Sequence, residues 1–321
     1  MQLTGNKLVL PLFDAQLSKH DSYYISDGVS VFNLPNSYEK KLCSQPELIA
    51  GYESSLKYMK SGLAIEPGKI ESCSGLDMQK LREIGTFVAM SIRLATGAPI
   101  DIPYWFDIDG DEIKGYGNTL LKTYRIDNNR KMYSLDDELW SGLSALQKGF
   151  ADILKEYIHK SNRNVLIRAL EFAAIGFQTR YIPPRLVNNT IFLESLFSYS
   201  NVEIAFQIAS SVSWYLESEN APEKRIDLFS KIKKLYNYRS KIVHGSDISS
   251  KNKNLLNSLL FSEKLNTKIY QRILLNKHIE IFSMKQDKRQ KELRNLSLGA
   301  NSKLIRTMHN PANSADSQTR G

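Results

Sequence analysis

Hydrophobic side chains recur at three- and four-residue steps through most of the chain after about residue 134, and this spacing constrains the fold most strongly. Such steps place apolar residues on one face of an α-helix, which must then pack against another element. One stripe runs from Trp140 to Tyr157, and further stripes occupy residues 165–173, 186–199, 202–216, 226–243 and 255–282. This succession of amphipathic segments predicts an all-helical bundle.

The first 130 residues differ from the rest of the chain. The segments LVLPLF and YYISDGVSVFNL predict strands, and residues 77–96 predict a helix that ends before Gly97. The segment IPYWFDIDGDEIKGYG predicts a hairpin that turns at Asp109-Gly110. The sequence therefore predicts an α+β N-terminal region followed by an all-α helical bundle. The expected boundaries are 1–130 for a mixed α/β domain without an assigned role, 131–284 for the helical domain, and 285–321 for a basic, disordered tail.

One predicted helix, RIDLFSKIKKLYNYRSKIVHG at residues 225–245, carries a charged residue on its apolar face. The apolar stripe consists of Leu228, Phe229, Ile232, Leu235, Tyr236, Ile242 and Val243. Arg239 occupies the next position due on that face, and burying a guanidinium is costly unless it has a partner. His244 follows five residues later, directly before Gly245, a residue that commonly ends helices.

Arg239 and His244 cannot both point at one small target from a regular helix. A five-residue step at about 100° per residue places the two side chains roughly 140° apart. Either the last turn is distorted where Gly245 ends the helix, or a second copy of the chain brings its own pair alongside. The second arrangement predicts a homodimer that forms through the helical domain.

Positive charge is concentrated around this helix. The chain has a formal net charge of +9, and residues 223–244 contain seven Lys or Arg against two acidic residues. The segment from residue 285 onward has eight Lys or Arg and three acidic residues, which is typical of a solvated basic tail. A basic helix attracts phosphate, so its charge favours RNA as a partner.

The segment LYNYRSKIVHG, with LESLFSYS at 193–200 and IAFQIASSVSWYLE at 204–217, resembles Apea-like members of the HEPN (higher eukaryotes and prokaryotes nucleotide-binding) superfamily. The similarity covers roughly residues 164–275 and is strongest at 235–245. That family is helical, usually dimeric, and marked by an arginine, four to six residues, and a histidine, which Arg239 and His244 match. Active ribonucleases of the superfamily often carry Asn, Asp or His after the arginine, whereas this chain has Ser240.

The resemblance implies a metal-independent endoribonuclease that acts as a homodimer and uses no cofactor. It also implies a role in toxin–antitoxin or phage-defence systems, with an antitoxin or another defence-system protein as partner. Cleavage of this type leaves a 2′,3′-cyclic phosphate and a 5′-OH.

Histidine and arginine suit metal-free RNA cleavage, which needs proton transfer and positive charge. His244 is the predicted acid/base, because an unperturbed imidazole has a pKa of about 6.5. Arg239 is predicted to bind phosphate and to stabilise the charge that develops in the transition state. Glu194 is the third catalytic candidate, either orienting His244 or pairing with Arg239. The residues expected to contact RNA are Ser240, Lys241, Lys234 and Tyr238.

A second interpretation assigns these residues no catalysis. Arg239 is then a buried arginine paired with a carboxylate, and His244 caps the C-terminal end of its helix, where the helix dipole favours it. Glu194 and the lysines are then ordinary solvated residues. On this interpretation the domain binds RNA or assembles with a protein partner without cutting.

The remaining features argue against a metal site and a membrane span. Asp111-Glu112-Ile113-Lys114, with Asp107 upstream, contains half of a metal-nuclease pattern, but a tight Asp-Gly turn explains these acids better. The other histidines lack Cys or His neighbours at metal-ligand spacing, so no metal site is predicted. No apolar run reaches the roughly 18 residues of a membrane span. Two cysteines fit a reducing compartment, which predicts a cytoplasmic protein.

Overall fold

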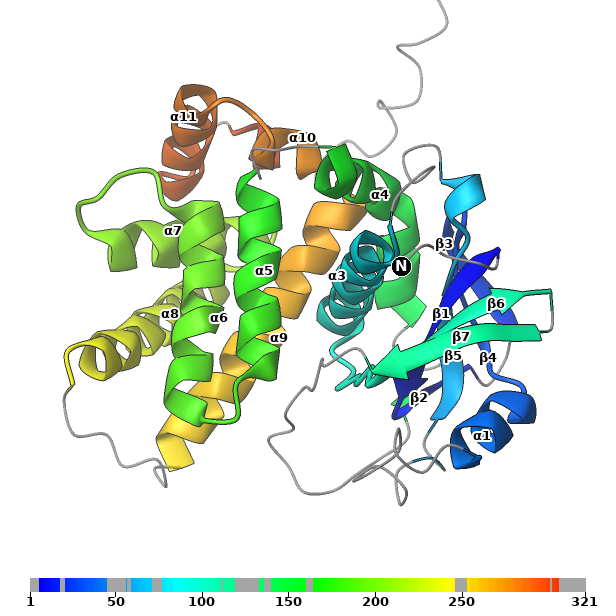
Figure 1. Ribbon diagram of the computed structural model, residues 1–321. Coiled ribbons are helices and arrows are strands. Elements are labelled where there is room, and N and C mark those ends of the chain that lie inside the picture. Colours follow the sequence, from blue (N-terminus) through cyan, green and yellow to red (C-terminus); the bar gives the residue numbers. More distant parts are fainter. Residues whose placement is uncertain are drawn as a thin grey trace, which may run out of the picture. The chain divides into compact units, whose positions relative to one another are not determined.

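The chain forms two compact units, one of residues 1–163 with 177–180 and the other of residues 164–176 with 181–321. Figure 1 labels their helices and strands, and an antiparallel sheet in the first unit precedes a mostly helical region, as predicted. The computed structural model describes residues 6–17, 21–44, 56, 59–70, 77–110, 112–118, 133–135, 140–159, 164–245, 253–300 and 302–305.

The first unit contains a six-stranded sheet in which every neighbouring pair is antiparallel. Its order is β3 (Ser22–Ser26), β4 (Val29–Asn33), β5 (Met59–Ile65), β1 (Lys7–Phe13), β6 (Tyr104–Asp109) and β7 (Glu112–Asn118). The short strands β2 (Ala15–Gln16) and β8 (Tyr133–Ser134) pair in parallel, and a 3₁₀ turn, η2 (Pro67–Lys69), follows β5. The predicted hairpin is confirmed, because β6 and β7 pair on either side of Gly110, whose φ of 58° suits a tight turn.

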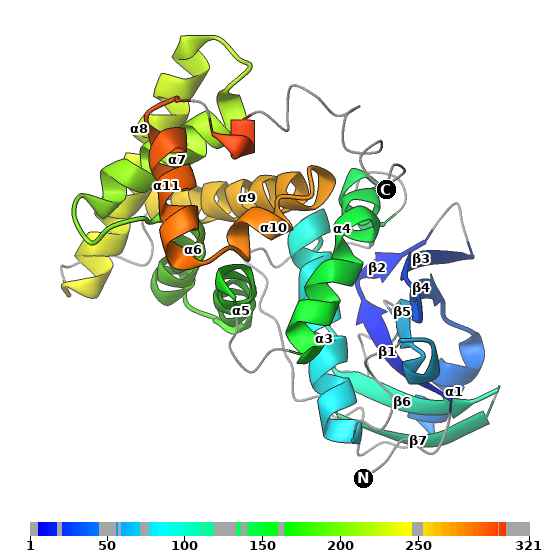
Figure 2. The same cartoon turned by 90° about the horizontal axis from the view of Figure 1, so that it is seen from above.

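Successive side chains of a strand point to opposite sides, so both faces of this sheet carry side chains that need covering. One helix packs on each face. On one face, α1 (Asn36–Cys43) places Tyr38 edge-on against Phe106 with ring centroids 5.1 Å apart. On the other face lies α3 (Met78–Thr96), which confirms the helix predicted at residues 77–96 (Figure 2). Gly85 lets α3 approach the sheet closely, because a Cβ there would lie 2.5 Å from Leu10 Cδ1.

Helix α4 (Trp140–His159) belongs to the first unit, so the domain boundary lies beyond the predicted residue 130. Its Gly142 lies against the backbone of Ala95 at the end of α3, and Tyr157 stacks on Phe87 with centroids 4.0 Å apart. The spacing of apolar residues in α4 correctly predicted that one face is buried. It carried no information on which element would cover that face.

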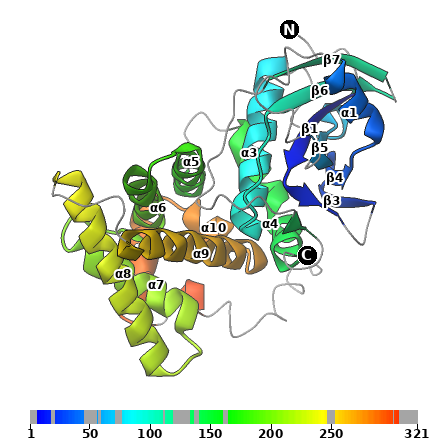
Figure 3. The same ribbon diagram turned by 90° about the horizontal axis from the view of Figure 1, so that it is seen from below.

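The second unit consists of helices, and α6 packs against α7, α8 and α9. Its helices are α5 (Val165–Gln178), α6 (Ile182–Phe197), α7 (Ile204–Glu217), α8 (Pro222–Val243), α9 (Lys253–Leu275), α10 (Ile279–Phe282) and α11 (Gln286–Ser297). Figure 3 shows α8 lying alongside α7, and a short connection at residues 218–221 joins the two helices. Polar contacts join α6 to α9, where Arg185 pairs with Glu263 at 2.6 Å and Asn189 donates a hydrogen bond to Ser262 Oγ at 3.0 Å.

The segment predicted to be a disordered tail begins with a packed helix. In α11, Leu293 and Leu296 are fully buried, and Ser210 Oγ of α7 donates to the carbonyl oxygen of Ser297 at 2.5 Å. Two leucines three residues apart are enough to bury one face of a short helix, although the composition of the whole segment is polar. The prediction for residues 306–321 falls outside the described residues.

Gly142→Ala is expected to destabilise the first unit by about 2 kcal/mol, despite the roughly 1 kcal/mol by which alanine favours a helix over glycine. The added Cβ would lie 2.3 Å from the carbonyl oxygen of Ala95, a backbone atom that cannot rotate away. Gly68→Ala is the control, because open space surrounds that position. Calorimetric unfolding of both variants measures the effect, and equal stability would contradict the close approach of α3 and α4.

Candidate functional site

The predicted site occupies the last turns of α8, a helix that buries only a narrow face. Its buried residues are Ile232, Leu235 and Tyr236. The His244 N–H donates to the carbonyl oxygen of Ser240 at 3.0 Å, so the backbone stays helical as far as His244. Gly245 then leaves the helix with a φ of 70°. The last turn is therefore regular, and it does not turn His244 toward Arg239.

Arg239 projects from the inner face of α8 and pairs with Glu194 of α6. Arg239 Nε lies 3.3 Å from Glu194 Oε1, and the two side chains are 30% and 21% exposed. The buried Nε forms no aligned hydrogen bond, so the contact is an ion pair alone. Of the two roles expected for Glu194, the structure provides the pairing with Arg239. The guanidinium thus has the carboxylate partner that its position on an apolar face requires.

The Glu194 carboxyl group lies in a partly desolvated environment. Burial raises its pKa above the usual value, and Arg239 and the Tyr236 hydroxyl group oppose this shift to a smaller extent. Burial, followed by the charge of Glu194, raises the pKa of Tyr236 well above its usual value. Tyr236 therefore stays neutral and donates to the Thr190 carbonyl oxygen at 3.4 Å, within reach of Glu194. Arg239 therefore supplies the positive charge that balances the Glu194 carboxylate.

His244 is exposed on a different face of α8 from Arg239. On a regular helix the two side chains point roughly 140° apart. Within the described residues no side-chain partner holds the imidazole of His244. The ring is thus open to a substrate or to a second protein chain, but one protomer does not bring it to Arg239.

His278 provides a contrast, because it is a structural histidine of the same unit. It is 1% exposed, and its Nδ1 lies 2.8 Å from the Tyr215 hydroxyl oxygen. Burial and the nearby charge of Arg272 lower the pKa of His278 to about 4, so it is neutral at physiological pH. Of these two histidines, His244 alone is placed to exchange protons with a bound molecule.

The predicted RNA-contacting residues lie on two flanks of α8. Lys234, Tyr238 and Lys241 follow one another at four- and three-residue steps on one flank, whereas Ser240 lies on the flank of His244. Tyr238 is half-buried, and the other three side chains are exposed. In the described part of the chain, none of them pairs with another residue. On a regular helix Lys234 and Lys241 point roughly 140° and 160° away from Arg239, so these lysines lie on the side of α8 away from the guanidinium.

Tyr236 was predicted to lie in the apolar stripe of α8, and it is buried, but its polar contacts were not predicted, and neither was the exposure of Phe206 on α7. Tyr236 contacts both Thr190 and Glu194, and its place three residues before Arg239 on the same face could have indicated this. Phe206 of α7 is 47% exposed and lies beside Phe229 of α8. Its spacing resembles that of a core residue, so the sequence carries no signal for its exposure.

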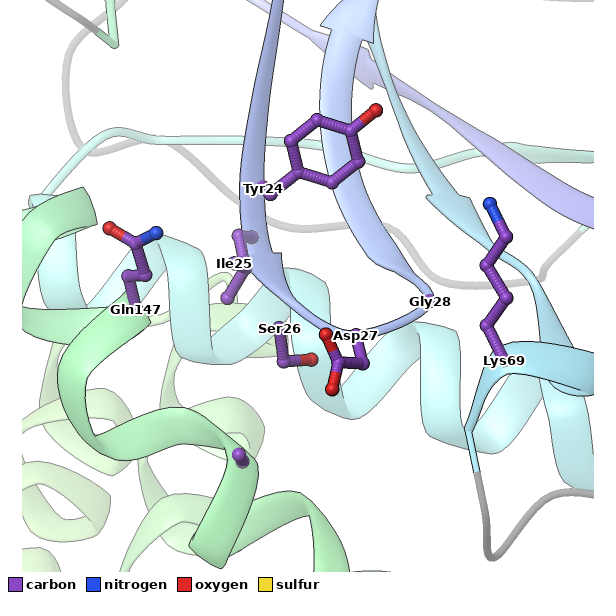
Figure 4. A pocket seen from close by; sticks show the side chains of 8 residues that line it. Tyr24, Ile25, Ser26, Asp27, Gly28, Lys69 and Gln147 are labelled. Atoms are coloured by element: carbon purple, nitrogen blue, oxygen red, sulfur yellow. The ribbon is translucent and has the colours of Figure 1, made fainter.

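A hollow of about 690 Å³ in the first unit contains none of the predicted site residues (Figure 4). It is lined by Tyr24, Ile25, Ser26, Asp27, Gly28, Lys69, Gln147 and Ala151. Its charged residues have opposite signs, and Lys69 pairs with Glu66 at 2.7 Å. The hollow therefore lacks the concentrated positive charge that a phosphate chain requires.

The described acids of the metal-nuclease pattern, Asp107 and Glu112, belong to no cluster that could hold a metal ion. Glu112 pairs with Lys114 at 2.6 Å, Asp107 is buried, and Asp111 lies outside the described residues. Among the residues with described positions, no group of three or more His, Cys, Asp or Glu side chains is arranged to hold a metal ion. No described helix has both the length and the apolar composition needed to cross a bilayer.

Replacing either partner of the Arg239–Glu194 pair is expected to cost stability, because Arg239→Met leaves a partly buried carboxylate unpaired and Glu194→Gln leaves a partly buried guanidinium unpaired. A double-mutant cycle of Arg239→Met and Glu194→Gln should show a coupling energy of about 1 kcal/mol in urea unfolding. The matched control is the Lys231–Asp227 pair, 2.6 Å apart on the exposed surface of α8, where coupling stays below about 0.5 kcal/mol. Additive effects at Arg239 and Glu194 would contradict the pairing.

Comparison with known proteins adds no further constraint on this site. No protein-family model, curated protein or solved structure matches the chain. Functional assignment therefore rests on the chemistry and geometry of α6, α7 and α8.

Proposed function

We propose that the helical unit is a metal-independent endoribonuclease of HEPN type that acts as a homodimer. The observation that carries this proposal is the placement of Arg239, which Glu194 holds at 3.3 Å on a helix that ends at an exposed histidine. An arginine used only for packing has no need of solvent access, yet 30% of this side chain is exposed. The side chain is thus restrained at its Nε and still partly exposed to solvent.

The homodimer follows from the directions of the two side chains. In one protomer Arg239 and His244 point roughly 140° apart, so one phosphate cannot contact both. A second copy can place its own histidine near the first arginine. Val243 supports such an interface, because it lies one turn beyond Arg239 on the same face and is 51% exposed. An apolar residue beside the site suits protein contact.

In the proposed reaction, a neutral His244 accepts the proton of the RNA 2′-OH while the 2′ oxygen attacks the adjacent phosphorus. A new O2′–P bond forms, the P–O5′ bond breaks, and the leaving 5′ oxygen takes a proton from water. Arg239 stabilises the negative charge that develops on the phosphoryl oxygens, and Glu194 keeps the guanidinium in position. The products are a 2′,3′-cyclic phosphate and a 5′-OH.

The surrounding residues fit a polyanionic substrate. Lys234 and Lys241 add positive charge on the outer side of α8, Tyr238 lies at the edge of that side, and Ser240 offers a hydroxyl group on the flank of His244. Such an enzyme would work in the cytoplasm as a toxin or in phage defence, restrained by an antitoxin or another partner protein. A second candidate function is RNA binding or protein assembly without cleavage. The engagement of Arg239 by Glu194 favours that alternative, because the carboxylate competes with phosphate for the guanidinium.

Cleavage of end-labelled single-stranded RNA in EDTA tests the proposed function. Arg239→Ala and His244→Ala should each lower the rate about 100-fold or more, the range typical for loss of an acid/base or charge-stabilising group. Lys264→Ala, at an exposed position of α9, is the control and should cleave like the wild type. The new ends should be a 2′,3′-cyclic phosphate and a 5′-OH.

Two results would contradict ribonuclease activity at this site. Salt-sensitive RNA binding without any cleavage by the wild type would favour the non-catalytic function. Cleavage that EDTA abolishes, and that survives both substitutions, would direct attention to the acids around Glu112.

A further inference from the structure

We propose that one exposed flank of α8 and an aromatic pair shared with α7 form a binding track for single-stranded RNA, in which Phe206 stacks on a base. This inference rests on the proposed function and names the form of its substrate. The track is defined as Lys233, Asn237, Ser240 and His244 together with the pair Phe206 and Phe229.

The α8 part of the track is continuous. Lys233, Asn237, Ser240 and His244 follow one another at steps of four, three and four residues, which keeps them on one face of the helix. All four are exposed, and this face carries a lysine and no acidic side chain. Asp227, the nearest acid along α8, faces another side and is engaged by Lys231 at 2.6 Å. A phosphate chain therefore meets no carboxylate of α8 on this flank.

An aromatic platform lies at the other end of the track from His244. Phe206, in the first turn of α7, contacts Phe229 with ring centroids 5.6 Å apart and an interplanar angle of 75°. This contact leaves 47% of Phe206 exposed, and the Nζ of Lys233 lies 5.9 Å from the centroid of the Phe229 ring. An exposed ring beside a lysine can receive a base and its phosphate together.

The spacing between the platform and His244 sets the length of RNA that the track accommodates. Phe229 and His244 are 15 residues apart (244 − 229), which is about 22 Å along the helix axis. At the roughly 3.4 Å axial spacing of a stacked strand, this distance corresponds to about six nucleotides. A paired base is not free to stack on Phe206, so the track selects single-stranded RNA.

Length-dependent RNA binding tests the track. Fluorescence anisotropy is measured with the unaltered full chain and labelled oligoadenylates of 2 to 12 nucleotides that carry 2′-O-methyl groups, which block cleavage and leave the bases and phosphates in place. Affinity should rise up to about six nucleotides and then level off. Phe206→Ala should weaken binding of the longer RNAs about 10-fold and leave the shortest unaffected, whereas Phe206→Trp should retain binding. Tyr181→Ala, at a tyrosine that is 69% exposed, is the aromatic control and should bind normally.

Full affinity in Phe206→Leu would overturn the proposal, because any apolar side chain would then suffice and the surface would be a protein-docking site. An equal loss at every RNA length would also overturn it. Failure of the proposed function is distinguishable, since RNA cleavage measured separately depends on Arg239 and His244. Cleavage combined with no effect of the Phe206 substitutions on binding would contradict the track alone. Length-dependent binding without cleavage would contradict the ribonuclease activity alone. Absence of both RNA binding and RNA cleavage would contradict both proposals.

Discussion

A charged guanidinium on the packing face of α8 is the constraint on which the helical site depends. Arg239 continues the face that buries Ile232, Leu235 and Tyr236, and Glu194 of α6 provides the compensating carboxylate at 3.3 Å. A partly buried ion pair adds little net stability compared with apolar residues, but separating its partners is costly. The pair therefore opposes rotation or sliding of α8 over α6.

In the proposed enzyme, different faces of α8 have different roles. The inner face holds Arg239, whereas Lys234, Lys241 and His244 lie on the outer side of the helix and Tyr238 at its edge. Because the arginine and the histidine diverge, a complete site needs a second protomer, whereas binding of a single strand needs only one flank. Under the proposed function, this division would make catalysis depend on assembly, while RNA recognition would belong to each protomer.

Local features of the sequence predicted much of the structure. The helix expected at residues 225–245 is found as Pro222–Val243, and the requirement for a carboxylate near Arg239 is met by Glu194. These predictions succeeded because helical periodicity and the cost of burying a charge are properties of short segments.

The structure differs from the predictions where contacts join segments that are distant in the sequence. The apolar stripe of α4 predicts a buried face, but nothing within the stripe states that the end of α3 would cover it. The polar composition of residues 285–321 gave no indication of α11, because its two buried leucines are a small part of that segment. The exposure of Phe206 depends on where the start of α7 lies relative to α8, which residue spacing does not encode. The catalytic and RNA-binding roles of Arg239, His244, Ser240 and the lysines remain predictions.

The central claim is that Arg239 of one protomer acts with His244 of another, and subunit mixing tests it most directly. Arg239→Ala and His244→Ala homodimers are unfolded together, refolded as a mixture and assayed for RNA cleavage. A mixed dimer retains one intact arginine and one intact histidine on different chains, so activity should return well above that of either variant alone. Mixed dimers that form, as shown by two distinguishable tags, and stay as inactive as the parent variants would contradict the claim.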